Sequence, residues 1–188
     1  MLPLPDGQFA CICADPPWSF RSNSKAKPGR NAMRHYDCMT LDEIAALPVR
    51  AVAADDCALF LWITGPFLAI GAHIPIMKAW GFKPTAMAFD WAKRNRSGHG
   101  AFMGGGFTTR ANVEYVVLGK RGRSVRRDAG VRSLIVANVR EHSRKPDEFY
   151  ERVERYCAGP RLELFGRQSR ENWTVWGEQS TKFDTVAA

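Results

Sequence analysis

The chain has 188 residues, of which 45% are hydrophobic and 24% are charged, a composition typical of one soluble globular domain with its own core. No apolar run reaches the roughly 18 residues of a membrane-spanning helix, and no basic, apolar leader precedes the first predicted strand. The formal net charge of +8 suits a polyanionic partner such as nucleic acid, although many basic domains bind none. We therefore expect a single domain over residues 1–188, without a membrane segment, in the cytoplasm.

The five cysteines show no pattern typical of a disulfide framework or of a zinc site. Their number is odd, and neither a CxxC pair nor a Cys/His grouping with zinc-ligand spacing is present. Cys11 and Cys13 alternate along an apolar run that is typical of a buried strand. We therefore expect reduced core cysteines of an intracellular protein, and no metal site.

The first predicted strand ends at the most informative turn of the chain. Phe9–Ala14 is a continuous apolar run, which indicates a strand buried on both faces of a parallel sheet. The run stops at the sequence Asp-Pro-Pro, because proline cannot continue the strand ladder. Residues 21–36 follow as a loop with five Lys or Arg and no acidic residue.

The remaining chain alternates between helices and strands. A capping box at Thr40–Glu43 predicts a short helix that ends before Pro48. Residues 131–139 are partly extended, and residues 180–188 form a flexible tail. The further predicted elements are strands at Cys57–Thr64, Thr85–Trp91, Val113–Leu118, Arg161–Phe165 and Trp173–Trp176, and helices at Pro66–Trp80 and Pro146–Cys157. This alternation predicts an α/β fold with a mostly parallel sheet and helices on both faces.

The turn at residues 15–18 has the groups needed to methylate an aromatic amine. The lone pair of such an amine is delocalised into its ring, so an attack on a methyl sulfonium requires that the pair be localised on nitrogen. The Asp15 carboxylate and the Pro16 carbonyl could do this by accepting hydrogen bonds from the NH2 group, because proline fixes the turn. Trp18 offers a flat face for the base. The structural alternative is a strand-ending turn whose Asp caps a helix, which any isolated Asp-Pro-Pro would favour.

Several separate motifs agree with this chemistry. They are ADPPW at 14–18, CALFLWITGP at 57–66, SLIVANVREHSRKPDEFYERVERYCAG at 133–159, LELFGR at 162–167 and NWTVWGEQ at 172–179. In this order they resemble the N6-adenine methyltransferases of the eukaryotic messenger-RNA adenosine methyltransferase type, with their bacterial and phage relatives. The resemblance implies a Rossmann-like, S-adenosylmethionine-dependent methyltransferase fold in which the catalytic motif precedes the cofactor-binding strand.

The resemblance also implies the site residues. The catalytic set is Asp15, Pro16, Pro17 and Trp18, and methyl transfer is an in-line displacement without a metal. The residues implied for the S-adenosylmethionine pocket are Asp15, Lys145, Glu163, Phe165, Arg167, Asn172 and Gln179. A carboxylate at a strand end, such as Glu163, can accept the ribose hydroxyls, and Arg167 or Lys145 could pair with the methionine carboxylate. The alternative for each of these charges is a surface ion pair or a solvated side chain.

Two basic loops without acidic residues predict where nucleic acid binds. Residues 21–36 and 93–110 each follow a predicted strand, so both should overhang the same edge of the sheet. Phosphates need Lys and Arg, and a base taken from its stack needs an aromatic face. The candidate substrate-binding residues are Trp18, Arg30, Arg34, Tyr36, Lys93 and Arg94. Gly104–Gly106 lacks the GK[ST] ending of a phosphate loop and reads as a flexible lid.

The predicted function is methylation of adenine N6 in nucleic acid. The small size resembles the bacterial and phage members, which favours DNA over RNA. The alternatives are an RNA adenosine methyltransferase, a non-catalytic nucleic-acid-binding subunit, and a methyltransferase for small amines or protein side chains. The intact Asp-Pro-Pro-Trp sequence argues against the subunit, and the basic loops argue against a small amine. Sequence preference must then come from the loops, from a homodimer partner or from an accessory specificity subunit.

Overall fold

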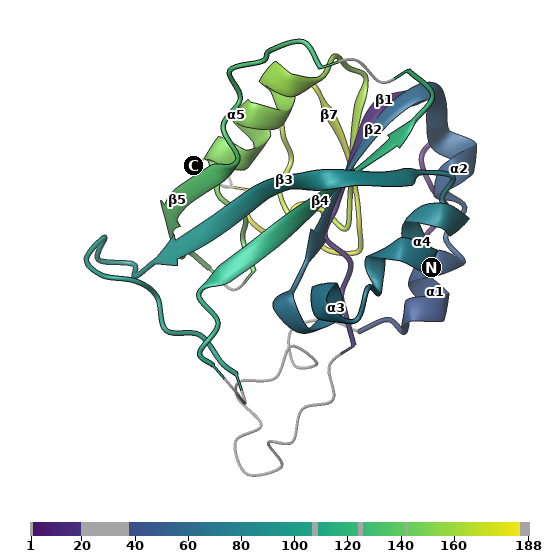
Figure 1. Ribbon diagram of the computed structural model, residues 1–188. Coiled ribbons are helices and arrows are strands. Elements are labelled where there is room, and N and C mark those ends of the chain that lie inside the picture. The colour runs from purple at the N-terminus through teal and green to yellow at the C-terminus, as the bar shows by residue number, and fades with distance from the viewer. Residues whose placement is uncertain (1, 20–37, 107–108, 124–125, 142, 185–188) are drawn as a thin grey trace.

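The computed structural model describes residues 2–19, 38–106, 109–123, 126–141 and 143–184, which form a seven-stranded sheet with helices around it (Figure 1). The strands lie in the order β5-β3-β4-β2-β1-β6-β7. Their bounds are β1 (Phe9–Ala14), β2 (Ala53–Ile63), β3 (Lys83–Arg94), β4 (Val113–Arg121), β5 (Leu134–Asn138), β6 (Arg161–Leu164) and β7 (Trp173–Trp176).

All neighbouring strands are parallel except the two pairs that include β4. The predicted mostly parallel sheet is therefore confirmed. From β1 the chain continues to β2 on one side, whereas β6 and β7 lie on the other side of β1. Open α/β sheets bind ligands where the strand order reverses in this way, outside the carboxyl ends of the strands. In this fold that position lies beyond Ala14 and Leu164, the last residues of β1 and β6.

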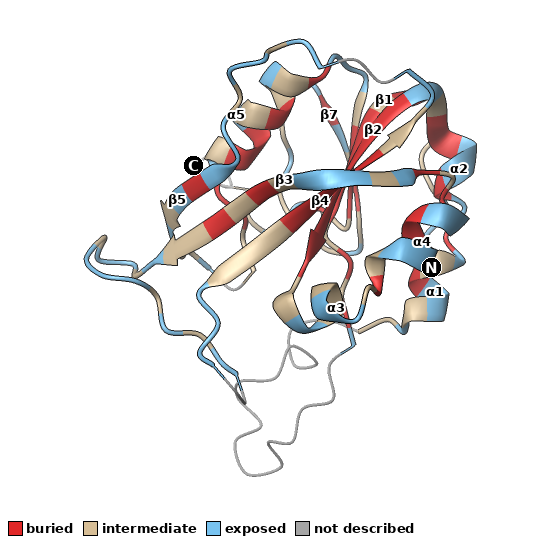
Figure 2. Ribbon diagram, in the orientation of Figure 1, coloured by how far each residue is buried: buried red, intermediate tan, exposed pale blue. Residues whose placement is uncertain are grey.

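Helices cover both faces of the sheet, as predicted (Figure 1). The helices are α1 (Leu41–Ala45), α2 (Val49–Val52), α3 (Gly65–Ala69), α4 (His73–Ala79) and α5 (Asp147–Tyr156). Ile12 of β1 packs in a core with Ile44 and Trp80, whereas its neighbour Cys13 packs on the opposite face with Phe149 of α5. Successive residues of a strand point to opposite faces, so β1 and most of β2 are buried on both (Figure 2). No helix of the described residues is long and apolar enough to cross a membrane.

Several predicted boundaries shift. The strands Phe9–Ala14 and Trp173–Trp176 and the capping box of α1 agree with the prediction. The single helix predicted over Pro66–Trp80 is instead the pair α3 and α4, because Gly71 adopts a φ of +70° between them. The third strand extends as far as Arg94, so the first two residues of the predicted basic loop belong to β3.

The C-terminal segment, predicted as a flexible tail, makes specific contacts as far as residue 184. The backbone N–H and the hydroxyl of Ser169 both donate to the carboxylate of Asp184, at 2.7 Å each. The backbone N–H of Phe183 donates to the carbonyl of Arg167 at 2.9 Å. Residues 180–184 are thereby attached to the loop that follows β6.

Candidate active site

A cavity of about 500 Å³ lies at the edge of the sheet where β1, β2 and β3 end. Asp15, the residue directly after β1, lies in its wall together with Glu114 and Lys145. Aromatic side chains from four parts of the chain complete the wall: Trp18, Trp62, Trp91 and Phe102. We call this the Asp15 cavity. It has the carboxylate and the flat apolar surfaces that the turn at residues 15–18 predicts.

A buried lysine connects the two carboxylates of this cavity. The Nζ atom of Lys145 lies 2.9 Å from Oδ2 of Asp15 and 2.9 Å from Oε2 of Glu114, and Lys93 binds the other oxygen of Glu114. Lys145 is only 7% exposed, so its charge is stable there because of these partners. Burial alone would lower the pKa of Lys145, but the charges of Asp15 and Glu114 outweigh burial and raise it.

Glu114 is held ionised by the same contacts. Burial alone would raise the pKa of Glu114, but the charges of Lys145 and Lys93 outweigh burial and lower it to about 2. Glu114 and Lys145 therefore stay charged throughout the physiological pH range. Lys145, clamped by Glu114, in turn fixes the direction of the Asp15 carboxylate. The cavity thus presents an immobilised acceptor rather than a freely rotating side chain.

The turn after β1 is rigid, and it uses Trp18 differently from the prediction. The carbonyl of Pro16 accepts the N–H of Trp18 at 2.8 Å, and a carbonyl oxygen has a second lone pair for another donor. The indole N–H of Trp18 donates to the carbonyl of Trp62 at 3.2 Å, and its ring packs against Phe67 with 5.1 Å between centroids. Trp18 is 4% exposed. Its ring therefore holds the turn in place, and little of the predicted stacking face is accessible.

A second cavity, of about 270 Å³, lies on the other side of Asp15. We call it the Phe165 cavity. Much of its lining comes from the turn after β1 and from the turns after β6 and β7, and includes Asp15, Pro17, Phe165, Gly166, Arg167, Gly177 and Gln179. A Cβ atom on Gly177 would lie 2.9 Å from the carbonyl oxygen of Gly166, so glycine lets the two turns approach closely. The result is a recess at the reversal point of the strand order.

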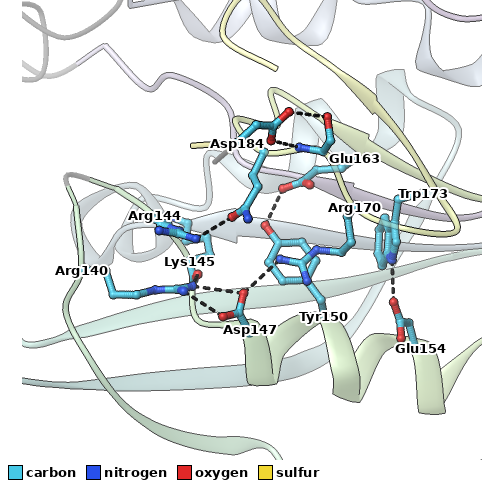
Figure 3. Close-up of polar contacts among 12 residues, drawn as sticks. Arg140, Arg144, Lys145, Asp147, Tyr150, Glu154, Glu163, Arg170, Trp173 and Asp184 are labelled. Carbon is cyan, nitrogen blue, oxygen red and sulfur yellow. Dashed lines mark hydrogen bonds and ion pairs between the residues drawn. The ribbon is translucent and has the colours of Figure 1, made fainter. Parts of the chain in front are cut away.

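A narrow pocket of about 30 Å³ contains Asp15, Lys145, Glu163 and Arg167 in its wall, and so borders both cavities. Glu163 is 8% exposed, and the hydroxyl of Tyr150 donates to its Oε1 atom at 2.5 Å (Figure 3). Burial raises the pKa of Glu163 to about 7, although the Tyr150 hydrogen bond and other charges partly oppose this rise. Glu163 is thus a buried acceptor that changes its charge near neutral pH.

An ion-pair network packs against the ring of Tyr150. The guanidinium of Arg170 stacks on the Tyr150 ring, 3.7 Å from its centroid, and pairs with Asp147 at 3.1 Å. Arg140 also pairs with Asp147, at 2.8 Å (Figure 3). α5 and the loop after β6 are thereby connected beside Glu163.

The structure does not bring every predicted residue to these cavities. Asn172 is exposed and precedes β7, whereas Gly177 and Gln179 follow it, so Asn172 lies toward the opposite edge of the sheet and lines none of the three. Arg94 is exposed at the end of β3, and Lys93 lines the Asp15 cavity with its charge paired to Glu114. The predicted substrate contacts Arg30, Arg34 and Tyr36 lie outside the described residues.

Sequence reasoning missed Glu114 and Tyr150. Glu114 is an acidic residue within an apolar strand, and a buried charge of this kind requires a partner, which was the available signal. Tyr150 occupies an apolar position of α5, and no feature of the sequence distinguishes it from an ordinary core residue. In the described part of the chain, no cluster of His, Cys, Asp or Glu could hold a metal ion. Cys11, Cys13, Cys57 and Cys157 are free and buried.

Known proteins share this sequence over most of its length. A family model described as MT-A70 matches residues 9–179. The type II methyltransferase M.MunI of Mycoplasma sp is 30% identical over 192 residues, which cover 93% of this chain and 78% of the relative. The N(6)-adenosine-methyltransferase MT-A70-like protein of Drosophila melanogaster is 34% identical, over 92% of this chain and 27% of the relative. The human N(6)-adenosine-methyltransferase catalytic subunit METTL3 is 33% identical, over 92% of this chain and 28% of the relative. The chain therefore spans little more than a quarter of these two animal relatives.

Proposed function

The chain belongs to the MT-A70 family, and from this premise we propose that it transfers a methyl group from S-adenosylmethionine to the N6 amine of adenine in nucleic acid. The observation that carries the proposal is the position of the Asp15 carboxylate. It is held by Lys145 and lies in the walls of both the Asp15 cavity and the Phe165 cavity. One acceptor can therefore serve a reaction between two ligands bound on either side of it.

The Phe165 cavity and the narrow pocket fit the cofactor. S-adenosylmethionine supplies an electrophilic methyl group on a sulfonium. The Glu163 carboxylate suits the ribose hydroxyls, as a strand-end acid does in other nucleotide-binding α/β folds. Arg167 lies in the walls of both the pocket and the cavity, where it can pair with the amino-acid carboxylate of the cofactor. Gln179 adds polar groups on the β7 side.

The Asp15 cavity suits the adenine. The two protons of the amine can be donated to the Asp15 carboxylate and to the free lone pair of the Pro16 carbonyl. These hydrogen bonds withdraw the nitrogen lone pair from the ring and direct it at the methyl carbon. A nitrogen–carbon bond forms as the sulfur–carbon bond breaks. The nitrogen then loses one proton, for which Asp15 is the adjacent acceptor.

A polymer, rather than a small amine, is the substrate that we propose. The cavity floor holds Lys145 and three buried tryptophans, so a base reaches it only after it has left its stack. Arg96 lies in the same wall and is exposed, as a phosphate contact requires. We favour DNA because the relative that the chain spans over 78% of its length is a type II methyltransferase.

Transfer of label from the cofactor tests this function. The protein is incubated with methyl-tritiated S-adenosylmethionine and either DNA, RNA or small amines, and labelled polymer is hydrolysed to identify the modified base. We expect N6-methyladenine in DNA, and no label with Asp15→Asn. Label in RNA alone would overturn the choice of DNA, and label in a small amine alone would overturn the choice of nucleic acid. Cofactor and nucleic-acid binding without any transfer would identify a non-catalytic subunit.

A further inference from the structure

We propose that Phe102 supplies the aromatic face on which the target adenine stacks in the Asp15 cavity. The inference rests on the proposed function and adds a residue that neither the catalytic turn nor the cofactor pocket contains. Phe102 belongs to the loop between β3 and β4, and it lies in the wall of the same cavity as Asp15 and Lys145.

The three tryptophans of the cavity are not available for stacking. Trp62 is 2% exposed, and the Nζ atom of Lys145 lies over its ring, 4.8 Å from the centroid. Trp91 is 3% exposed and has Nζ of Lys93 over its ring, also at 4.8 Å. Trp18 packs against another aromatic ring and is as deeply buried. These rings form the floor of the cavity and orient its charges, and none offers a free face.

Phe102 differs from the tryptophans in both exposure and contacts. It is half-buried, and among the residues that the structure describes no ring or cation packs on its side chain. An uncharged aromatic ring suits an uncharged purine, because stacking desolvates no charge. Phe102 is therefore the wall residue whose side chain can cover a flat base.

Backbone hydrogen bonds hold Phe102 in place without burying its ring. Its N–H donates to the carbonyl of Lys93 at 2.9 Å, so the ring is attached next to the lysine that binds Glu114. Two residues further, the N–H of Gly104 donates to the carbonyl of Ala111 at 2.9 Å. A Cβ atom on Gly104 would collide with that same carbonyl oxygen, so glycine is required by close packing here. Within the predicted lid, Gly104 is thereby packed against Ala111 and supports the backbone next to Phe102.

Steady-state kinetics on the accepted nucleic acid test the inference. We expect Phe102→Ala to lower kcat/KM about 10- to 100-fold, mainly through KM, because stacking on an aromatic side chain contributes this much per base. Phe102→Trp should retain activity. The cofactor Kd from calorimetry should be unchanged in both variants. The matched control is Met103→Ala, since Met103 is 70% exposed and does not line the cavity.

A spectroscopic measurement distinguishes stacking from a structural role. When 2-aminopurine replaces the target adenine, stacking quenches its fluorescence in the free nucleic acid. The fluorescence should stay low on binding to the wild-type protein and to Met103→Ala, where Phe102 restores a stacking partner, and should rise on binding to Phe102→Ala. Unchanged KM and unchanged quenching in Phe102→Ala would overturn the inference and leave the proposed function standing. If the wild-type protein labels no nucleic acid, both are overturned.

Discussion

The ammonium group of Lys145 lies 2.9 Å from a carboxylate oxygen of Asp15 and bridges it to Glu114. The bridge places one buried cation between two acids, so the loss of either acid still leaves Lys145 with one partner. The consequences for stability and for chemistry can therefore be separated by mutation. Asp15 faces both cavities, whereas Glu114 faces only the Asp15 cavity.

Replacing Asp15 should abolish the reaction without unfolding the protein. In Asp15→Ala or Asp15→Asn, the amine loses its side-chain acceptor, and we expect methyl transfer to fall at least about 100-fold. Lys145 remains paired with Glu114, so the melting temperature should change by only a few degrees. Labelled transfer and thermal unfolding, measured on the same preparation, check both parts. Near-normal turnover in Asp15→Ala would show that the mechanism is wrong.

Removing Lys145, unlike removing Asp15, should lower the stability of the fold. Lys145→Met leaves the carboxylates of Asp15 and Glu114 without their shared cation, and we expect a loss of about 3 kcal/mol in the free energy of unfolding. Adding Glu114→Gln to this variant removes one of the two negative charges and should recover part of that loss. Denaturant unfolding of the single and double variants measures the coupling. Additive losses would contradict the network.

The sequence predicts the parts of the site that depend on local pattern. The run Phe9–Ala14 and the prolines after it suffice to locate a buried strand and a rigid turn that carries Asp15. The pairing of Glu114 with Lys145 joins residues 31 positions apart, and no local pattern indicates which charges the fold brings together. The turn that breaks Pro66–Trp80 into two helices depends on a single glycine conformation.

Residue type alone could not decide two of the predicted roles. A tryptophan suits a core as well as a base, and only the packing of Trp18 against Phe67 shows which face is used. Asn172 and Gln179 belong to one matching segment, but a four-residue strand separates them and carries them toward opposite edges of the sheet. Residues of one continuous sequence motif can therefore lie at two different sites in the fold.

Cofactor binding should weaken as the pH falls through 7. The pKa of Glu163 is raised to about 7 by burial, with Tyr150, Arg170, Asp15 and Lys145 as the neighbouring charged or titratable groups. Ribose hydroxyls donate best to the ionised carboxylate, so binding below pH 7 requires the loss of a proton from Glu163. We expect the calorimetric Kd to rise about tenfold from pH 8 to pH 6.

Glu163→Gln should bind the cofactor more weakly at pH 8 and should lack this pH dependence, because an amide does not titrate. Titration of the cofactor itself is common to both proteins and cancels in the comparison. Arg167→Ala should also weaken binding of the cofactor. The affinity for nucleic acid should stay the same in both variants. A Kd for the cofactor that is unchanged in Glu163→Gln at every pH would remove Glu163 from the pocket.

The place where nucleic acid binds can be determined from the salt dependence of its affinity. Each phosphate contact that is lost lowers the slope of log affinity against log salt by about 0.7 to 0.9. Arg30 and Arg34 belong to the basic segment that follows the catalytic turn in the sequence, and Arg126 and Arg127 are exposed between β4 and β5. We expect Arg30→Ala with Arg34→Ala to reduce the slope and raise KM, and Arg126→Ala with Arg127→Ala to change neither.

Both double variants remove two positive charges, so a general loss of electrostatic attraction affects them equally and the second serves as the control for the first. The cofactor Kd should be the same in both, because neither pair has a role in the proposed cofactor site. The reverse pattern, with an unchanged slope for Arg30 and Arg34 and a reduced one for Arg126 and Arg127, would place the polymer near the far end of β4. That segment lies beyond the edge of the sheet opposite Asp15, since β4 begins beside the Asp15 cavity and ends at Arg121. The target base could then reach the Asp15 carboxylate only if the bound nucleic acid ran along the whole length of the β-sheet.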